Sequence, residues 1–381
     1  MAMHVLFPGP RTTIQDQGRP GYQNSGFAPG GFMDRDAAKT ANVLVGNEDT
    51  EAVLEFCLIG PVLFFDETVN IAVSGGDFGI DVEGTFCPAD RPVRVPAGKK
   101  VKITTGQAGL YGSLAVGGGL DIPPVMGSRS TSLRCGIGGF RGRALAAGDE
   151  IPLRNPENGR KDLSWRWVPP RRLVPPYDPA AARVRVIPGP QENMFTPKGL
   201  QTFYESAYEI TSHSDRMGYR LTGPRVEAAD GYDILSDGIA NGSIQISGSG
   251  EPIVMMADRQ TTGGYAKIAS VITVDLPLFA QLRPGQKVRF EKCTVQEAQK
   301  LLREEDKMWK DHCRMLEENS PDHYKPYRLS FSEEGSSRSG CRSCRRSGWA
   351  GRKPRRAGLR SGRKSAGQKS AGRKSAYRSC R

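Results

Sequence analysis

The sequence predicts a mainly β protein with a few short helices, one longer helix near the C-terminus and a disordered basic tail. Glycine (46) and proline (27) both exceed ordinary usage, and these residues divide a chain into many short strands. Short runs rich in β-branched and aromatic residues recur between the turn residues, as strands require. The third observation is the distribution of charge.

Positive charge is concentrated at the end of the chain. From residue 331 onward there are 16 Lys and Arg against 2 acidic residues, so the other 330 residues hold 38 basic and 39 acidic residues. The body is therefore electrically neutral. The tail has too few apolar residues to offset its chain entropy, so we expect it to be disordered. Its only expected partners are nucleic acid or acidic surfaces, bound without specificity.

Four segments are expected along the chain, because 381 residues are enough for two domains. They are a first β lobe at 1–154, a proline-rich connector at 155–182, a second β lobe with a closing helix at 183–320, and the Arg/Ser/Lys-rich tail at 321–381.

In the first lobe the sequence predicts one short helix among strands. The helix begins after Asp34, a residue suited to cap it, and ends before Gly46, which suits a left-handed stop. The clearest strands are expected at 12–15, 68–73, 100–104 and 110–116. Short strands at this spacing are typical of a barrel or a sandwich.

In the second lobe strands are expected at 183–187, 243–247, 253–257, 271–275 and within 282–290. Thr196 and Pro197 open a short helix through about Glu205. Thr294 and Glu297 form a capping box for a long helix that ends near 319. The apolar face of that helix, which includes Met308 and Trp309, is expected to contact the core.

The most informative stretch is the loop that follows the strand at 253–257. A glycine pair, Gly263 and Gly264, ends a run of polar side chains there. The run is Asp258, Arg259, Gln260, Thr261 and Thr262. Loops on rigid flanks concentrate binding groups, and glycine lets backbone approach a ligand closely. The alternative is a polar hairpin turn.

A second candidate loop carries Ser128, Arg129 and Thr131 on a turn led by glycine. A planar guanidinium between hydroxyls can bind a carboxylate or phosphate with two hydrogen bonds. The alternative is an exposed arginine on a serine-rich turn. The earlier loop with Gln15, Asp16 and Arg19 is equally consistent with turn chemistry and with a ligand contact.

A third candidate loop carries His213, Asp215 and Arg216 ahead of a strand. Imidazole titrates near neutral pH, so His213 is a candidate for proton transfer, although a lone histidine beside a strand is more often structural. Asp215 and Arg216 either bind a ligand or pair with each other.

Several classes of function are excluded by what the sequence lacks. It has no G-x-S-x-G elbow, no phosphate-binding G-x-x-x-x-G-K-[ST] loop, no H-E-x-x-H and no dinucleotide fingerprint. Its four histidines form no cluster with cysteine, and Cys341-x-x-Cys344 lacks a second pair, so no metal site is expected. No signal peptide and no apolar run of membrane-spanning length occur, and the five body cysteines form no close pairs, so we expect a cytoplasmic protein with no membrane contact. The remaining arginine, aspartate, glutamine, serine and threonine side chains on glycine-rich turns suit an anionic or amide-like ligand held between the lobes.

The separated motifs together resemble those of the allophanate hydrolase subunit 2 family, from about residue 4 to 305. The motifs are GPRTTIQDQGRPGY at 9–22, MD at 33–34, ANVLVGN at 41–47, LE at 54–55, GSRST at 127–131, GD at 148–149, SDRMGY at 214–219 and ADRQTTGGY at 257–265. This family of proteins related to biotin-dependent carboxyltransferases includes the C subunit of prokaryotic 5-oxoprolinase, the KipA protein and the carboxyltransferase region of urea carboxylase. Its members usually end near the helix after Thr294. The tail is therefore either a frame-shifted or read-through extension or an added binding segment.

The resemblance implies cyclophilin-like β-barrel lobes and a function shared with other subunits. The implied reaction is the ATP-dependent opening of 5-oxo-L-proline to L-glutamate, with a KipI-like subunit 1, a LamB/YcsF-like third subunit, and ATP bound by the complex. One alternative is a KipA-like regulator that antagonises a KipI-like kinase inhibitor. Another is a carboxyltransferase or allophanate-hydrolase-like subunit acting on a urea-derived substrate.

The candidate site residues divide by chemistry. Arg129, Arg216 and Arg259 are expected to bind an anion, and Asp215 and Asp258 to orient the substrate or act as a base. Hydrogen bonds to substrate are expected from Ser128, Thr131, Gln260, Thr261 and Thr262.

Overall fold

The computed structural model describes residues 1–167 and 181–318, and it confirms the mainly β class. Residues 168–180 of the predicted connector and the whole predicted tail lie outside the described residues, so the disorder of the tail stays a prediction. We refer to 1–167 as the first half and to 181–318 as the second half.

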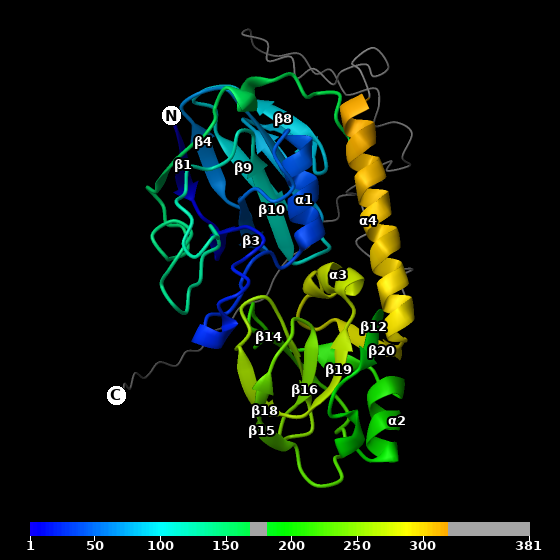
Figure 1. Cartoon of the computed structure of the whole chain (residues 1–381). Helices are drawn as coiled ribbons and strands as arrows, with labels where there is room; N and C mark the ends of the chain where they lie inside the picture. The colour runs from blue at the N-terminus through cyan, green and yellow to red at the C-terminus, as the bar shows by residue number, and fades with distance from the viewer. Residues whose placement is uncertain (168–180, 319–381) are drawn as a thin grey trace, which may run out of the picture. The chain divides into compact units, whose positions relative to one another are not determined.

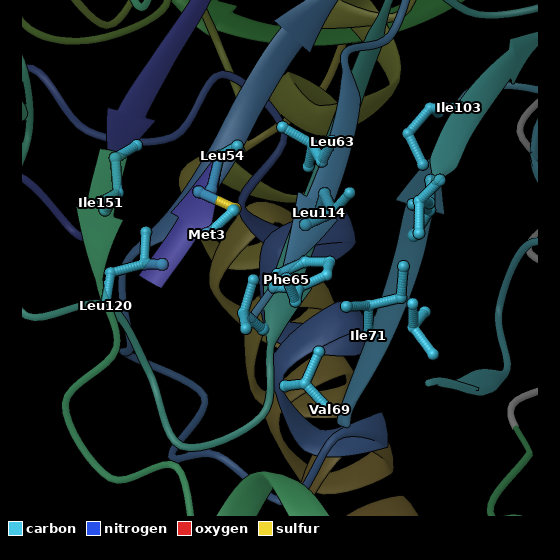
Figure 2. Packing of buried hydrophobic residues seen from close by; sticks show 14 of the residues in the cluster. Met3, Leu54, Leu63, Phe65, Val69, Ile71, Ile103, Leu114, Leu120 and Ile151 are labelled. Carbon is cyan, nitrogen blue, oxygen red and sulfur yellow. The ribbon is translucent and has the colours of Figure 1, made fainter. Parts of the chain in front are cut away.

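The strands of the first half form two sheets around one apolar core. The six-stranded sheet has the order β11-β1-β4-β9-β6-β7, and the five-stranded sheet has the order β2-β3-β10-β5-β8. The strands are β1 (Ala2–Phe7), β2 (Thr12–Gln15), β3 (Val53–Cys57), β4 (Val62–Phe65), β5 (Val69–Gly75), β6 (Phe78–Val82), β7 (Thr85–Pro88), β8 (Pro92–Val95), β9 (Val101–Thr105), β10 (Tyr111–Val116) and β11 (Glu150–Pro152). Figure 2 shows Met3, Leu54, Phe65, Ile71 and Leu114 converging in this core, where each is fully buried.

Helix α1 (Arg35–Leu44) begins and ends as its sequence predicts. The Asp34 carboxylate accepts the Ala37 N–H at 2.9 Å, and Gly46 has φ 78° just beyond the helix. Ala37, Ala38 and Ala41 are fully buried where the helix packs on β5 and β10. Their small side chains let the helix approach the sheet closely.

In the second half seven strands form a closed barrel in the order β12-β19-β16-β17-β14-β13-β20, and β15 pairs with β18 in a separate ribbon (Figure 1). These strands are β12 (Ala182–Pro188), β13 (Tyr208–Ile210), β14 (Gly218–Thr222), β15 (Asp233–Gly238), β16 (Ser243–Ile246), β17 (Pro252–Met255), β18 (Thr262–Tyr265), β19 (Lys267–Val271) and β20 (Lys287–Lys292). The strands predicted at 243–247 and 253–257 are present as β16 and β17, and they are antiparallel neighbours.

One predicted strand, at 271–275, is wrong. The strand lies earlier, as β19, and Thr273–Asp275 forms a 3-10 turn that leads into α3 (Leu276–Ala280). Asp275 decides this: its carboxylate accepts the main-chain N–H of Arg185 at 2.7 Å and pairs with the Arg185 guanidinium. The aspartate therefore fixes a turn where the β-branched residues alone favoured a strand.

The helices of the second half have the predicted caps. Thr196 caps α2 (Pro197–Glu205), and Thr294 and Glu297 form the predicted capping box of α4 (Val295–Glu318). The expected end of α4 near 319 lies outside the described residues.

Helix α4 packs on the first half, beside α1 (Figure 1). Trp309 donates its indole N–H to Asp49 at 3.0 Å, and Leu316 packs in one cluster with Ala38 and Ala41. The predicted core contact of Met308 is wrong, because this residue is 67% exposed. Adjacent residues on a helix point about 100° apart, so Trp309 faces α1 while Met308 faces outward.

A buried glutamine also joins the two halves. Gln281 follows α3, accepts the main-chain N–H groups of Leu110 and Tyr111 at 2.8 and 3.1 Å, and donates to the second carboxylate oxygen of Asp34 at 2.7 Å. The residue that caps α1 is thus also held by the barrel half.

Candidate functional site

A cavity of about 490 Å³ is lined by residues from both halves. Its lining residues are Arg11, Gly26, Ala28, Ser132, Leu133, Arg134, Cys135, Asp215, Arg216, Met217, Asp258, Arg259, Gln260, Thr261 and Thr262. Seven of the ten predicted site residues are among them. Residues at 11, 26–28 and 132–135 also line the cavity, and the sequence did not predict them as site residues. The last of these directly follows the predicted 128–131 loop.

Strand pairing brings two of the predicted loops together. β14 and β17 are antiparallel neighbours with Gly218 opposite Met255, so the loop before β14 lies beside the loop after β17. Main-chain bonds continue the contact: Asp258 N–H donates to the Arg216 carbonyl at 2.8 Å. Residues 42 positions apart thereby form one wall of the cavity.

Arg216 is buried and fully engaged by protein groups. Its guanidinium bonds both oxygens of Asp258, at 2.8 and 3.0 Å, pairs with Glu55 of β3, and donates to the Gly31 carbonyl at 2.7 Å. Burial by itself would lower the pKa of Arg216, but the carboxylates of Asp258 and Glu55 raise it above its ordinary value. Arg216 does not pair with its neighbour Asp215; it holds the two halves together.

Glu55 was not identified as a site residue, although the LE motif contains it. Burial raises the pKa of its carboxyl, and the contacts with Arg216 and with the Met33 N–H, at 2.7 Å, oppose that rise. A glutamate in the otherwise apolar strand VLEFC was the available signal, because an acid buried in a strand needs a cationic partner.

Arg259 differs from Arg216 because its charge is not neutralised. The side chain is 7% exposed, and its Nε and Nη1 donate to the carbonyls of Ile239 and Met256, at 3.0 and 3.3 Å. Within residues 1–167 and 181–318 no carboxylate forms an ion pair with it. Burial lowers its pKa to about 10, with Asp258 opposing, so the group remains cationic at neutral pH. A partly desolvated cation in a cavity wall suits an anionic ligand.

Asp215 shapes the turn at the other side of the cavity. Its Oδ1 accepts the N–H groups of Met217 and Gly218, at 2.8 and 3.2 Å. His213 is exposed and is not among the lining residues.

The structure does not bring Ser128, Arg129 and Thr131 into this cavity. The reason is a hydrogen-bonded cluster on Asp16, which accepts the Ser128 and Ser130 hydroxyls at 2.6 Å each and the Arg129 main-chain N–H. Thr131 donates its hydroxyl to the Ile14 carbonyl at 3.0 Å, and the Arg129 guanidinium donates to the Ile122 carbonyl at 2.8 Å. These groups stabilise the loop after β2.

Two features are absent from the part of the chain that the structure describes. No group of three or more His, Cys, Asp or Glu residues within 1–167 and 181–318 has the geometry to hold a metal ion. None of the described helices combines the length and apolar character needed to cross a membrane.

Comparison with known proteins gives consistent matches. A model of the carboxyltransferase domain, subdomains A and B, matches residues 25–292. The C subunit of 5-oxoprolinase from Haemophilus influenzae is 36% identical over 302 residues, which are 78% of this chain and 93% of that protein. The Escherichia coli protein of the same name is 34% identical over 311 residues, 80% of this chain and 96% of that protein.

Larger enzymes contain a similar region. The urea amidolyase of Lachancea kluyveri is 32% identical over 80% of this chain, which spans 18% of that protein. The crystal structure of Kluyveromyces lactis urea carboxylase has a TM-score of 0.74 at 28% identity, over 88% of this chain and 32% of the other. This chain therefore corresponds to one region of the longer urea carboxylase in that crystal structure.

Proposed function

This chain belongs to the carboxyltransferase domain family, subdomains A and B, and from that membership we propose that it is the C-type subunit of a 5-oxoprolinase. In that role it acts with partner subunits to open 5-oxo-L-proline to L-glutamate with ATP. The support is the similarity to two proteins named as the C subunit of 5-oxoprolinase, across nearly their whole length.

The observation that carries the proposal is the unneutralised charge of Arg259 beside neutral hydrogen-bonding groups. The substrate 5-oxoproline has one carboxylate and one lactam amide. Arg259 suits the carboxylate, and Gln260, Thr261 and Thr262 offer donors and acceptors in the same wall. A cavity of about 490 Å³ is ample for a ligand of this size.

The two aspartates of the cavity have different proposed roles. Asp258 is held rigidly by Arg216 and suits the orientation of the substrate. Asp215 uses one carboxylate oxygen to hold its own turn, and the second is the candidate for proton transfer.

The remaining catalytic groups are proposed to come from a KipI-like subunit 1 and a LamB/YcsF-like third subunit. We assign ATP to the complex. Arg11 and Arg134 line the cavity and are this chain's candidates for contact with the phosphates.

Reconstitution tests the proposal. Purified chain is mixed with the two partner subunits, and glutamate release from 5-oxoproline is measured with and without ATP. We expect release only when all subunits and ATP are present. A complete mixture that releases no glutamate above the ATP-free control contradicts the proposal.

The similarity to urea amidolyase and urea carboxylase favours a second candidate, action on a urea-derived substrate. Urea presents amide groups but no carboxylate for Arg259, whereas allophanate presents both. Offering urea or allophanate to the same assembled complex separates the two: turnover of either compound in place of 5-oxoproline supports the second candidate.

A further inference from the structure

Lys267, in strand β19 of the barrel, is buried and forms an ion pair with Asp237. Its side chain is 3% exposed, and Nζ donates to Oδ2 of Asp237 at 2.9 Å. Within residues 1–167 and 181–318 no other carboxylate pairs with it. The hydrogen bond from Lys267 lowers the pKa of the Asp237 carboxyl, so the pair is ionised at neutral pH. Burying an ammonium is costly, so the position of its one partner is informative.

Asp237 lies at the end of the β15–β18 ribbon that adjoins the cavity wall. In this ribbon Asp237 is opposite Gly263, and Gly238 is opposite Thr262, the first residue of β18. Thr262 lines the cavity. The ion pair therefore ties the cavity end of the ribbon to the barrel.

Two residues beyond Asp237, Ile239 holds the loop that carries Arg259. The Ile239 N–H donates to the Thr261 carbonyl at 3.0 Å. The Ile239 carbonyl accepts Nε of Arg259, also at 3.0 Å, and this is the shorter of the two hydrogen bonds of that guanidinium. The main chain at 237–239 thus connects the ion pair to the hydrogen bond that orients Arg259.

The packing around Ile239 is close. A Cβ on Gly263 would lie 2.7 Å from Cδ1 of Ile239 and 2.8 Å from Nε2 of Gln245, the barrel residue opposite Lys267. Real Cβ atoms almost never approach other atoms so closely, so glycine lets β18 pack against these two side chains. One glycine of the predicted pair therefore accommodates packing within the protein, which holds Ile239 between the ribbon and the barrel.

We propose that Lys267 is a positioning residue for Arg259. By holding Asp237, Lys267 fixes the carbonyl of Ile239, which orients the guanidinium in the cavity wall. This inference rests on the proposed function, in which Arg259 binds the substrate carboxylate. An arginine side chain that is not held in place must be ordered when the ligand binds, and that ordering lowers the affinity.

Lys267→Met tests this role, because it removes the ion pair without leaving a buried charge. Methionine is also unbranched and apolar, so it suits the space of the lysine stem. The Asp237 side chain is 56% exposed and can be hydrated once its partner is gone. The variant is therefore expected to fold.

The test compares two ligands on the assembled complex by calorimetry. One is 5-oxoproline; the other is 2-pyrrolidinone, which keeps the lactam ring but has no carboxylate. Wild type is expected to prefer 5-oxoproline by roughly 10- to 100-fold, the value of a charge-assisted contact. Lys267→Met should lose roughly 3- to 10-fold of that preference, which is the cost of ordering one long side chain on binding. Cyclopentanecarboxylate, which keeps a ring and the carboxylate but has no amide, should weaken by the same factor as 5-oxoproline.

A double-mutant cycle separates positioning from a general effect on the fold. In the Arg259→Met background, Lys267→Met should cause no further loss of preference, because the group that Lys267 positions is absent. Arg183→Met is the control: it removes an ion pair of the same 2.9 Å length from barrel strand β12, between two residues that do not line the cavity. The preference should not change in that variant.

Hydrogen exchange of the isolated chain tests the same link without ligand. The Ile239 N–H is expected to exchange faster in Lys267→Met than in wild type, because the end of β15 is no longer held. The amides of β17, inside the barrel, should keep their exchange rates. Unchanged exchange at Ile239 contradicts the inference.

The binding outcomes are distinct. A wild-type complex that binds 5-oxoproline no better than 2-pyrrolidinone, or a preference that survives Arg259→Met, overturns the proposed role of Arg259 and this inference together. A preference lost in Arg259→Met but kept in Lys267→Met overturns the inference alone. So does an equal loss from Lys267→Met in the wild-type and Arg259→Met backgrounds, since Lys267 would then act on the fold and not on the guanidinium.

Discussion

The guanidinium of Arg216 binds both carboxylate oxygens of Asp258, at 2.8 and 3.0 Å. Arg216 lies in the loop before β14 and Asp258 in the loop after β17, and these two strands are neighbours. The same guanidinium pairs with Glu55 in the first half. Arg216 therefore both orients a cavity residue and joins the two halves. We expect its replacement to lower the stability of the fold.

Replacing Arg216 with methionine is expected to destabilise the isolated chain by about 3–5 kcal/mol, because Glu55 is left buried without its cation. Urea unfolding measures the change. The double variant Arg216→Met, Glu55→Gln should recover part of the loss, since it removes the unpaired charge. A single variant as stable as wild type contradicts the structural role.

Replacing Arg259 with methionine should act on ligand binding. We expect the affinity of the assembled complex for 5-oxoproline to fall roughly 10- to 100-fold, the value of a charge-assisted contact. Because the contact is with the carboxylate, cyclopentanecarboxylate should weaken by the same factor. Arg183→Met is the control: this arginine lies in β12, its side chain is 62% exposed, and it pairs with the half-buried Glu291. Equal affinities in wild type and Arg259→Met would show that the loop at 258–262 is a structural turn with no role in ligand binding.

Two adjacent residues of α4 test which face of that helix packs on the first half. Trp309→Ala should cost about 1–3 kcal/mol, less than a fully buried tryptophan would, because it removes a large, partly buried side chain packed against α1 and the hydrogen bond to Asp49. Met308→Ala should change stability by less than about 0.5 kcal/mol, since Met308 faces outward. Both are measured by urea unfolding. Similar costs for the two variants would show that α4 does not pack by this face.

Asp149 predicts a dependence of stability on pH. Hydrogen bonds from Arg143, at 2.6 and 2.8 Å, lower the pKa of the Asp149 carboxyl. A lowered pKa in the folded state means that the stabilisation is fully present above the unfolded pKa of about 3.9 and is lost as pH falls through the folded value. The destabilisation by Asp149→Asn should therefore be constant from pH 7 to 5 and shrink below pH 4. A cost that is independent of pH down to 3 would exclude this linkage.

Much of the fold follows from local sequence. Caps at Asp34, Thr196 and Thr294 fix where three helices begin, since each cap hydrogen bond joins groups that are only three residues apart in the chain. Runs of β-branched residues fix most strands for the same reason. The failure at 271–275 came from a distant partner, Arg185, which no local pattern reveals.

The sequence by itself determined the β class, the starts of α1, α2 and α4 and the polar loop at 258–262, because each depends on neighbours along the chain. Only the tertiary structure decided which arginine has a free charge. Arg216 and Arg259 look alike in sequence, yet pairing of β14 with β17 and the approach of β3 give Arg216 two carboxylates and leave Arg259 facing the cavity. Ion pairing acts over a few ångströms in space and does not depend on separation in sequence, so it is settled only when the chain has folded.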